Sequence, residues 1–149
     1  MAVNDTKKLT QIVNKQVANW TVLFTKLHNY HWYVKGHHFF VLHDKFEELY
    51  NEAAVHIDEL AERLLALEEN PVATLKESLE MASIKEANGE QDAESMVQSI
   101  VDDFTIIIEE LKEGIDLATA AGDDTTGDML LAVHQSLEKH NWMLKAYLG

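Results

Sequence analysis

The chain has 149 residues, a formal net charge of −14, one proline, six glycines and no cysteine. This length suits one domain over residues 1–149 with a sizeable buried core. The lack of cysteine excludes disulfides and thiolate metal sites, and the negative charge argues against a broad basic face for nucleic acid. No run is apolar enough to span a membrane and residues 1–10 hold no apolar signal core, so we expect no membrane association and a cytoplasmic location.

A first long helix is predicted after a short start at Met1–Thr6, where the polar residues 4–6 offer an N-cap. The helix should stop at Gly36, because glycine readily takes the left-handed conformation that ends helices. His31 occupies a core-facing position on its apolar stripe. The other members of that stripe recur at helical spacing: Leu9, Ile12, Val13, Val17, Trp20, Phe24, Leu27 and Val34.

A second long helix should follow and end at Asn70–Pro71, since the residue before proline avoids helical angles. Beside its apolar stripe runs a second line of residues, with His43 and Glu47 at one end and Asp58 and Glu62 at the other. The members of each pair are four residues apart, so they are neighbours on the helix surface. The apolar stripe has three-and-four spacing: Leu42, Phe46, Leu49, Ala53, Ile57, Leu60 and Leu64.

The two pairs are too far apart to share one metal within a single chain. His43 and Asp58 are 15 residues apart, which is roughly 22 Å along a helix that rises about 1.5 Å per residue. If a second copy packs antiparallel and crosses near Asn51–Glu52, each end of one helix faces the opposite end of its partner. A two-fold interface of this kind makes two equivalent sites, each with imidazole and carboxylate ligands suited to iron.

The rest of the chain predicts a short helix and two further long helices. Thr74–Glu77 has the pattern of a capping box, which begins a short helix in the connection, and Ala87–Glu90 has the composition of a turn. The third long helix should stop at Gly122, and the fourth extends to Leu148. Four long helices with one long middle connection predict an all-α, up-down-down-up four-helix bundle with a short extra helix in that connection.

Three acids gather at the start of the last helix: Asp123, Asp124 and Asp128. Acids are favourable beside a helix N-terminus, and Thr125 with Asp128 can form a capping box, so a structural role is sufficient. The functional interpretation is an acidic pore for cations. It requires that several copies of the chain form a shell in which these helix ends gather around an axis.

Each candidate ligand also has an ordinary structural interpretation. His31 can be a core histidine whose nitrogens are hydrogen-bonded. His43 and Glu47 can form an ordinary ion pair or hydrogen bond on the helix surface. The acids at 58 and 62 can be solvated, and Arg63 is expected to pair with Glu59 rather than with them. No glutamate stands three residues before any histidine, so the Glu-x-x-His pattern of a di-iron site inside one bundle is absent. The remaining histidines are interpreted as structural or surface residues: His28, His37, His38, His56, His134 and His140.

Several stretches together resemble the Dps family of mini-ferritins, over nearly the whole chain: LHNYHWYVKGHHFFVLHDKFEELY, DELAERLLAL, AGDDTTGDMLL and EKHNWML. The resemblance implies a ferritin-like four-helix bundle that assembles into a hollow homododecamer. It implies ferroxidase sites at the two-fold dimer interfaces, with room for one or two irons each. His31 and His43 would come from one subunit, and Asp58 and Glu62 from its neighbour.

The same resemblance implies further roles. Glu47 stands where the family commonly has aspartate, which keeps the charge and adds a methylene. Trp32, which by itself suggests packing, matches a position associated with trapping oxidising equivalents. Asp123 and Asp128 match acidic pore positions, with Asp124 as a contributor. Members of the family oxidise Fe(II) with hydrogen peroxide in preference to oxygen and store the Fe(III) mineral, which protects the cell from oxidative damage.

Direct DNA binding is not expected. Family members that bind DNA generally use a basic terminal tail, whereas here only Lys7 and Lys8 precede the first helix and the sequence ends at Gly149. An anionic particle gains no counterion release from DNA. The alternative function is a DNA-compacting structural nucleoid protein with secondary iron chemistry, and a third possibility is a helical bundle whose site holds no metal in the cell.

Overall fold

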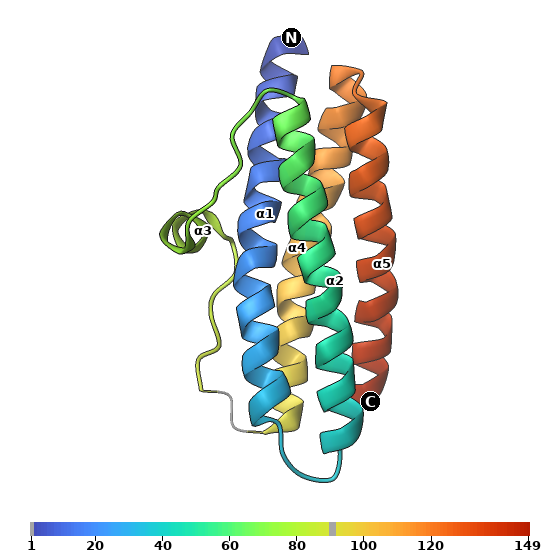
Figure 1. The fold of residues 1–149 in the computed structure, drawn as a ribbon. Helices are drawn as coiled ribbons and strands as arrows, with labels where there is room; N and C mark the ends of the chain where they lie inside the picture. The colour runs from blue at the N-terminus through green and yellow to red at the C-terminus, as the bar shows by residue number, and fades with distance from the viewer. Residues whose placement is uncertain (1, 90–91) are drawn as a thin grey trace.

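The computed structural model describes residues 2–89 and 92–149, with side chains from residue 4 onward. The described residues form helices and no strand: α1 (Ala2–Tyr33), α2 (Phe39–Ala66), α3 (Leu75–Met81), α4 (Ala93–Ala121) and α5 (Asp124–Leu148). The first two long helices are antiparallel, α2 and α4 are parallel, and α5 returns against α4 (Figure 1). The predicted up-down-down-up bundle with a short helix in its middle connection is therefore confirmed.

Two predicted helix limits are wrong. α1 begins at Ala2, so the polar residues 4–6 lie inside the helix and do not cap it. α2 ends at Ala66 rather than at Asn70–Pro71, because Glu68 takes a left-handed φ of +63°. The amide of Glu69 then donates to the carbonyl of Leu64 at 2.8 Å, a hydrogen bond that closes the end of the helix.

Other predicted limits are confirmed. The hydroxyl of Thr74 accepts the amide of Glu77 at 3.1 Å and starts α3. Gly122 ends α4 with a φ of +71°. Gly89, in the predicted turn at 87–90, has a φ of +76°, and Glu90 lies outside the described residues.

The core fills the space between the four long helices. Gly114 of α4 leaves room for Leu130 of α5 and Ile12 of α1, because a Cβ there would lie only 2.8 Å from Leu130 and 3.1 Å from Ile12. Lys26 and Asp103 form a buried ion pair of 2.7 Å that joins α1 to α4. The long connection with α3 runs along the outer side of α1 (Figure 1). None of the described helices is long and apolar enough to cross a membrane.

Candidate metal centre

The end of α1 and the start of α2 bring His31 and His43 together. Their rings stack with centroids 3.7 Å apart and planes 13° from parallel. Each ring is also bound to the backbone of the other residue: Nδ1 of His31 lies 2.7 Å from the carbonyl oxygen of His43, and Nδ1 of His43 lies 2.7 Å from the carbonyl oxygen of His31. The pair is therefore locked by reciprocal contacts.

These contacts decide which nitrogen can bind a metal. A carbonyl oxygen only accepts hydrogen bonds, so both Nδ1 atoms must donate. Each neutral ring then keeps its lone pair on Nε2. A histidine that donates its other N–H to a backbone carbonyl is the usual arrangement in protein metal sites, because the bond fixes the ring and raises its basicity. His31 and His43 thus form a preformed pair of imidazole donors.

A carboxylate and the ring of Tyr50 lie beside this pair. Glu47 Oε1 lies 3.9 Å from Nε2 of His31. Tyr50 meets the His31 ring edge-on at 5.3 Å and stacks on His28 at 3.7 Å. Burial, followed by the nearby negative charge of Glu47, raises the pKa of Tyr50.

Trp32 lies at the rim of this group. Its ring is 5.2 Å from that of His28, and 67% of the residue is exposed in the single chain. Tyr33 and Phe40, which flank the same helix ends, are also mostly exposed. A surface with this many exposed rings is suited to being covered by another subunit.

Asp58 and Glu62 are exposed and lie far along α2 from the histidine pair. No three histidines, aspartates or glutamates among the described residues converge to hold a metal within one chain. The structure therefore brings together His31, His43 and Glu47 but leaves the acid pair apart from them. A complete ligand set from these residues requires a second subunit.

The three acids at the start of α5 differ from one another. Asp123 is the N-cap and accepts the amide of Thr126 at 3.0 Å, whereas Asp124 and Asp128 are exposed. Arg63 does not pair with Glu59 as expected: its Nη2 lies 3.1 Å from Asp123 Oδ1, and its Nε donates to Thr126 at 2.9 Å.

Opposing effects set the acidity of Asp123. Burial opposes ionisation, but the hydrogen bonds from Thr126 and the charge of Arg63 outweigh it and lower the pKa of Asp123. One of the three acids thus has a structural role within the chain.

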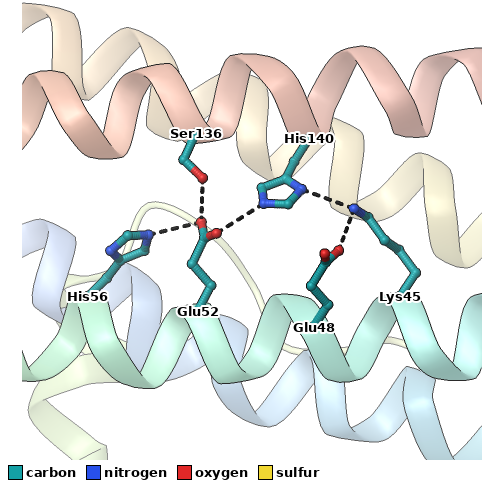
Figure 2. A network of polar contacts seen from close by, with 6 residues as sticks. All are labelled: Lys45, Glu48, Glu52, His56, Ser136 and His140. Atoms are coloured by element: carbon teal, nitrogen blue, oxygen red, sulfur yellow. Dashed lines mark hydrogen bonds and ion pairs between the residues drawn. The ribbon is translucent and has the colours of Figure 1, made fainter.

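A second polar cluster lies between α2 and α5, which approach each other less closely than the other neighbouring helices. Glu52 is its centre (Figure 2): Oε1 accepts from His140 at 3.0 Å, and Oε2 accepts from His56 at 3.0 Å and Ser136 at 2.9 Å. Lys45 Nζ lies 3.1 Å from Nδ1 of His140. Because Lys45 only donates, His140 carries its hydrogen on Nε2 and donates it to Glu52.

Both carboxylate oxygens of Glu52 accept hydrogen bonds from neighbouring side chains, so we interpret this cluster as structural. Burial would raise the pKa of Glu52, but hydrogen bonds from His140, His56 and Ser136 outweigh that effect and hold the pKa far below its ordinary value. The carboxylate is therefore charged and satisfied on both oxygens.

Sequence reasoning missed the surroundings of the histidine pair. His28 and Tyr50 were given no functional role, yet both line the group. A signal existed for Tyr50, because it stands three residues after Glu47 on the line that carries His43. Nothing in the sequence indicates that His28 stacks on a residue of the next helix.

Comparisons with known proteins match this description. A family model described as a ferritin-like domain matches residues 10–149. "General stress protein 20U" of Bacillus subtilis is 72% identical over 143 residues, covering 96% of this chain and 99% of that protein. "DNA protection during starvation protein 2" of Bacillus anthracis is 56% identical over 143 residues, covering 96% and 98%.

A solved structure agrees with the sequence comparisons. The Dps protein of Vibrio cholerae, described as a member of a broad superfamily of ferritin-like diiron-carboxylate proteins, superposes with a TM-score of 0.93. It is 36% identical, and the match covers 98% of this chain and 92% of that one. The chain therefore belongs to the Dps family of ferritin-like proteins.

Proposed function

We propose that this protein binds Fe(II) at sites shared between two subunits, oxidises it with hydrogen peroxide, and stores the Fe(III) inside a homododecameric shell. The reciprocal lock of His31 and His43 carries the proposal. Two imidazoles with free Nε2 lone pairs, and a carboxylate beside them, form half of a ligand set that suits iron. The description of the Vibrio cholerae relative as a diiron-carboxylate protein supports the choice of iron.

The other half of the site would come from a second subunit. Asp58 and Glu62 are exposed on α2, the same helix that begins beside the histidine pair. An antiparallel two-fold contact between copies of α2 would bring the acids of one chain to the imidazoles of the other, twice per dimer. Each site would then hold one or two irons between His31, His43 and Glu47 of one subunit and the acid pair of its partner.

The reaction follows from the charges of the ligands. Anionic carboxylates interact more strongly with Fe(III) than with Fe(II), so they favour oxidation. Two Fe(II) ions each give one electron to one hydrogen peroxide molecule, which takes up two protons and leaves as two water molecules. This pairing avoids release of hydroxyl radical. Trp32, at the rim of the site, would trap oxidising equivalents that escape, and Asp124 and Asp128 would line a pore that admits cations.

A stopped-flow comparison tests the proposal. Protein loaded anaerobically with Fe(II) is mixed with peroxide in one run and with oxygen in another, and Fe(III) formation is followed by absorbance. We expect faster oxidation by peroxide, with about one peroxide consumed per two Fe(II). Faster oxidation by oxygen would contradict the choice of oxidant. A rate no higher than that of a protein-free control would contradict the ferroxidase function.

The second candidate is DNA compaction, because relatives such as the Bacillus anthracis protein are named for DNA protection. The formal charge of −14 opposes direct binding, since phosphate contacts need clustered lysine and arginine. We therefore expect that any protection of DNA acts through removal of iron and peroxide. Stable complexes in a gel shift with iron-free protein, at neutral pH and about 0.15 M salt, would favour the second candidate.

A further inference from the structure

A third imidazole, that of His28 on α1, has the same arrangement as the two rings of the candidate metal centre. Its Nδ1 lies 2.7 Å from the carbonyl oxygen of Phe24. A carbonyl oxygen only accepts, so this Nδ1 must donate, as it does in His31 and His43. The neutral ring then keeps its lone pair on Nε2, the nitrogen farther from the helix backbone. His28 therefore offers a cation the same donor atom as the other two histidines.

Neighbouring rings fix the orientation of His28. Its ring stacks on that of Tyr50 with centroids 3.7 Å apart and planes 20° from parallel. The ring of Phe24 meets it edge-on at 4.6 Å. Together with the bond to the carbonyl oxygen, these contacts leave the imidazole little freedom to turn. A donor that is already oriented loses less conformational freedom when it binds a ligand.

The ring of His28 lies within reach of a second metal ion beside His31. The two residues are three apart on α1, so they are neighbours on one face of the helix. The Tyr50 ring is 3.7 Å from His28 and 5.3 Å from His31, and these distances add to 9.0 Å, so the two imidazole centroids are no farther apart than that. An imidazole nitrogen lies about 2 Å from a bound ion such as zinc, and the ions of two-metal sites are about 3.5–4 Å apart. Imidazoles on the two ions of one site can therefore be separated by such a distance.

We propose that His28 is the imidazole ligand of a second divalent cation at the shared site, while His31 and His43 bind the first. This inference rests on the proposed function, because no three ligands converge within the described residues of one chain and the second subunit must supply carboxylates. His28 is half-buried in the single chain, beside the 67% exposed Trp32 at the rim, where that subunit would cover it. A carboxylate has two oxygens and can bind one ion with each.

Titration of the assembled protein with Co(II) tests this role without turnover. Co(II) has the charge of Fe(II), accepts the same ligand types, and has a visible spectrum that reports its ligands. A two-fold dimer has two sites, so a filled pair of positions takes two Co(II) per chain. In His28→Gln we expect the first Co(II) to bind as in wild type. The second should bind about 10-fold or more weakly, since even loss of an outer partner costs that much.

A control and a second variant separate the nitrogen from the packing of the ring. His134→Gln removes a half-buried histidine of α5, which pairs with Glu138 at 3.4 Å, and should bind Co(II) as wild type does. His28→Phe keeps a ring against Tyr50 but has no nitrogen, so it should lose the second Co(II) as His28→Gln does. Size-exclusion chromatography establishes which variants assemble, and His28→Phe decides if His28→Gln does not. Retention of the second Co(II) in assembled His28→Phe would overturn the proposal.

The outcomes distinguish this inference from the function on which it rests. A wild-type protein that binds no Co(II) would overturn both. Equal numbers of bound Co(II), with equal affinities and spectra, in wild type and the assembled His28 variants would overturn only the role of His28.

Discussion

Arg63 Nη2 lies 3.1 Å from Asp123 Oδ1, and this contact ties the last turn of α2 to the first turn of α5. Both side chains are mostly buried, with 19% and 20% of their area exposed. The same aspartate caps α5 through Thr126. Asp123 is therefore engaged by residues of its own chain, whereas Asp124 and Asp128 remain exposed.

Asp123 and Asp128 should therefore respond differently to substitution. Asp123→Ala removes a helix cap and leaves Arg63 without its carboxylate, so we expect a loss of about 1–2 kcal/mol in the free energy of unfolding. Asp128→Asn should change stability by less than about 0.5 kcal/mol and slow iron uptake into the shell. Chemical unfolding and the rate of Fe(III) core formation measure the two effects. Normal iron uptake in Asp128→Asn would contradict its pore role.

The shared site predicts complementation between two inactive variants. His43→Gln and Asp58→Asn should each lose iron oxidation, because each damages both sites of a dimer. In a mixed dimer, one site carries both substitutions and the other carries neither. Random pairing makes half of the dimers mixed, so co-expressed chains should recover about a quarter of wild-type activity.

Differently tagged chains allow mixed dimers to be purified and assayed. A purified mixed dimer as inactive as either variant would show that these residues do not share a site. His37→Gln, on the exposed connection after α1, is the matched control and should keep full activity.

Removal of Glu52 should destabilise the bundle. Glu52→Ala leaves His56, His140 and Ser136 without their acceptor, which we expect to cost about 2–3 kcal/mol. Glu48→Ala is the control, because its side chain is 59% exposed and its ion pair with Lys45 should contribute less than about 1 kcal/mol. Urea unfolding at one fixed chain concentration measures both. Equal effects of the two substitutions would contradict the central role of Glu52.

The same residue predicts how stability depends on pH. The pKa of Glu52 in the folded protein lies well below its ordinary value of 4.5, so the unfolded chain binds its proton first as the pH falls. The contribution of Glu52 is thus fully present above about pH 4.5 and decreases below it, by at most about 1.4 kcal/mol per pH unit. The difference in unfolding free energy between wild type and Glu52→Ala should shrink from pH 5 to pH 3. A constant difference would contradict this assignment.

Periodicity predicted the long helices because each buries one apolar stripe, and that burial outweighs local preferences at most positions. The end of α2 was misplaced because the left-handed turn at Glu68 has no glycine to signal it. The candidate ligands on α2 were found from their spacing, and His31 from the family resemblance. Arg63 was assigned to Glu59 because sequence spacing reveals neighbours on one helix, whereas its contact with Asp123 depends on how α2 and α5 meet. The contact of Tyr50 with His31 was overlooked for a similar reason, since it depends on how α1 and α2 pack together.

The reciprocal bonds of His31 and His43 have a consequence for the peptide that joins α1 to α2. Each imidazole takes its alignment from the other residue's carbonyl group, at 2.7 Å in both directions, and none of these bonds involves residues 35–38. The connecting segment joins two helix ends that these bonds already hold together. Its length and composition can therefore drift during evolution, or be changed by insertion at the left-handed Gly36, while the two nitrogen donors keep their spacing.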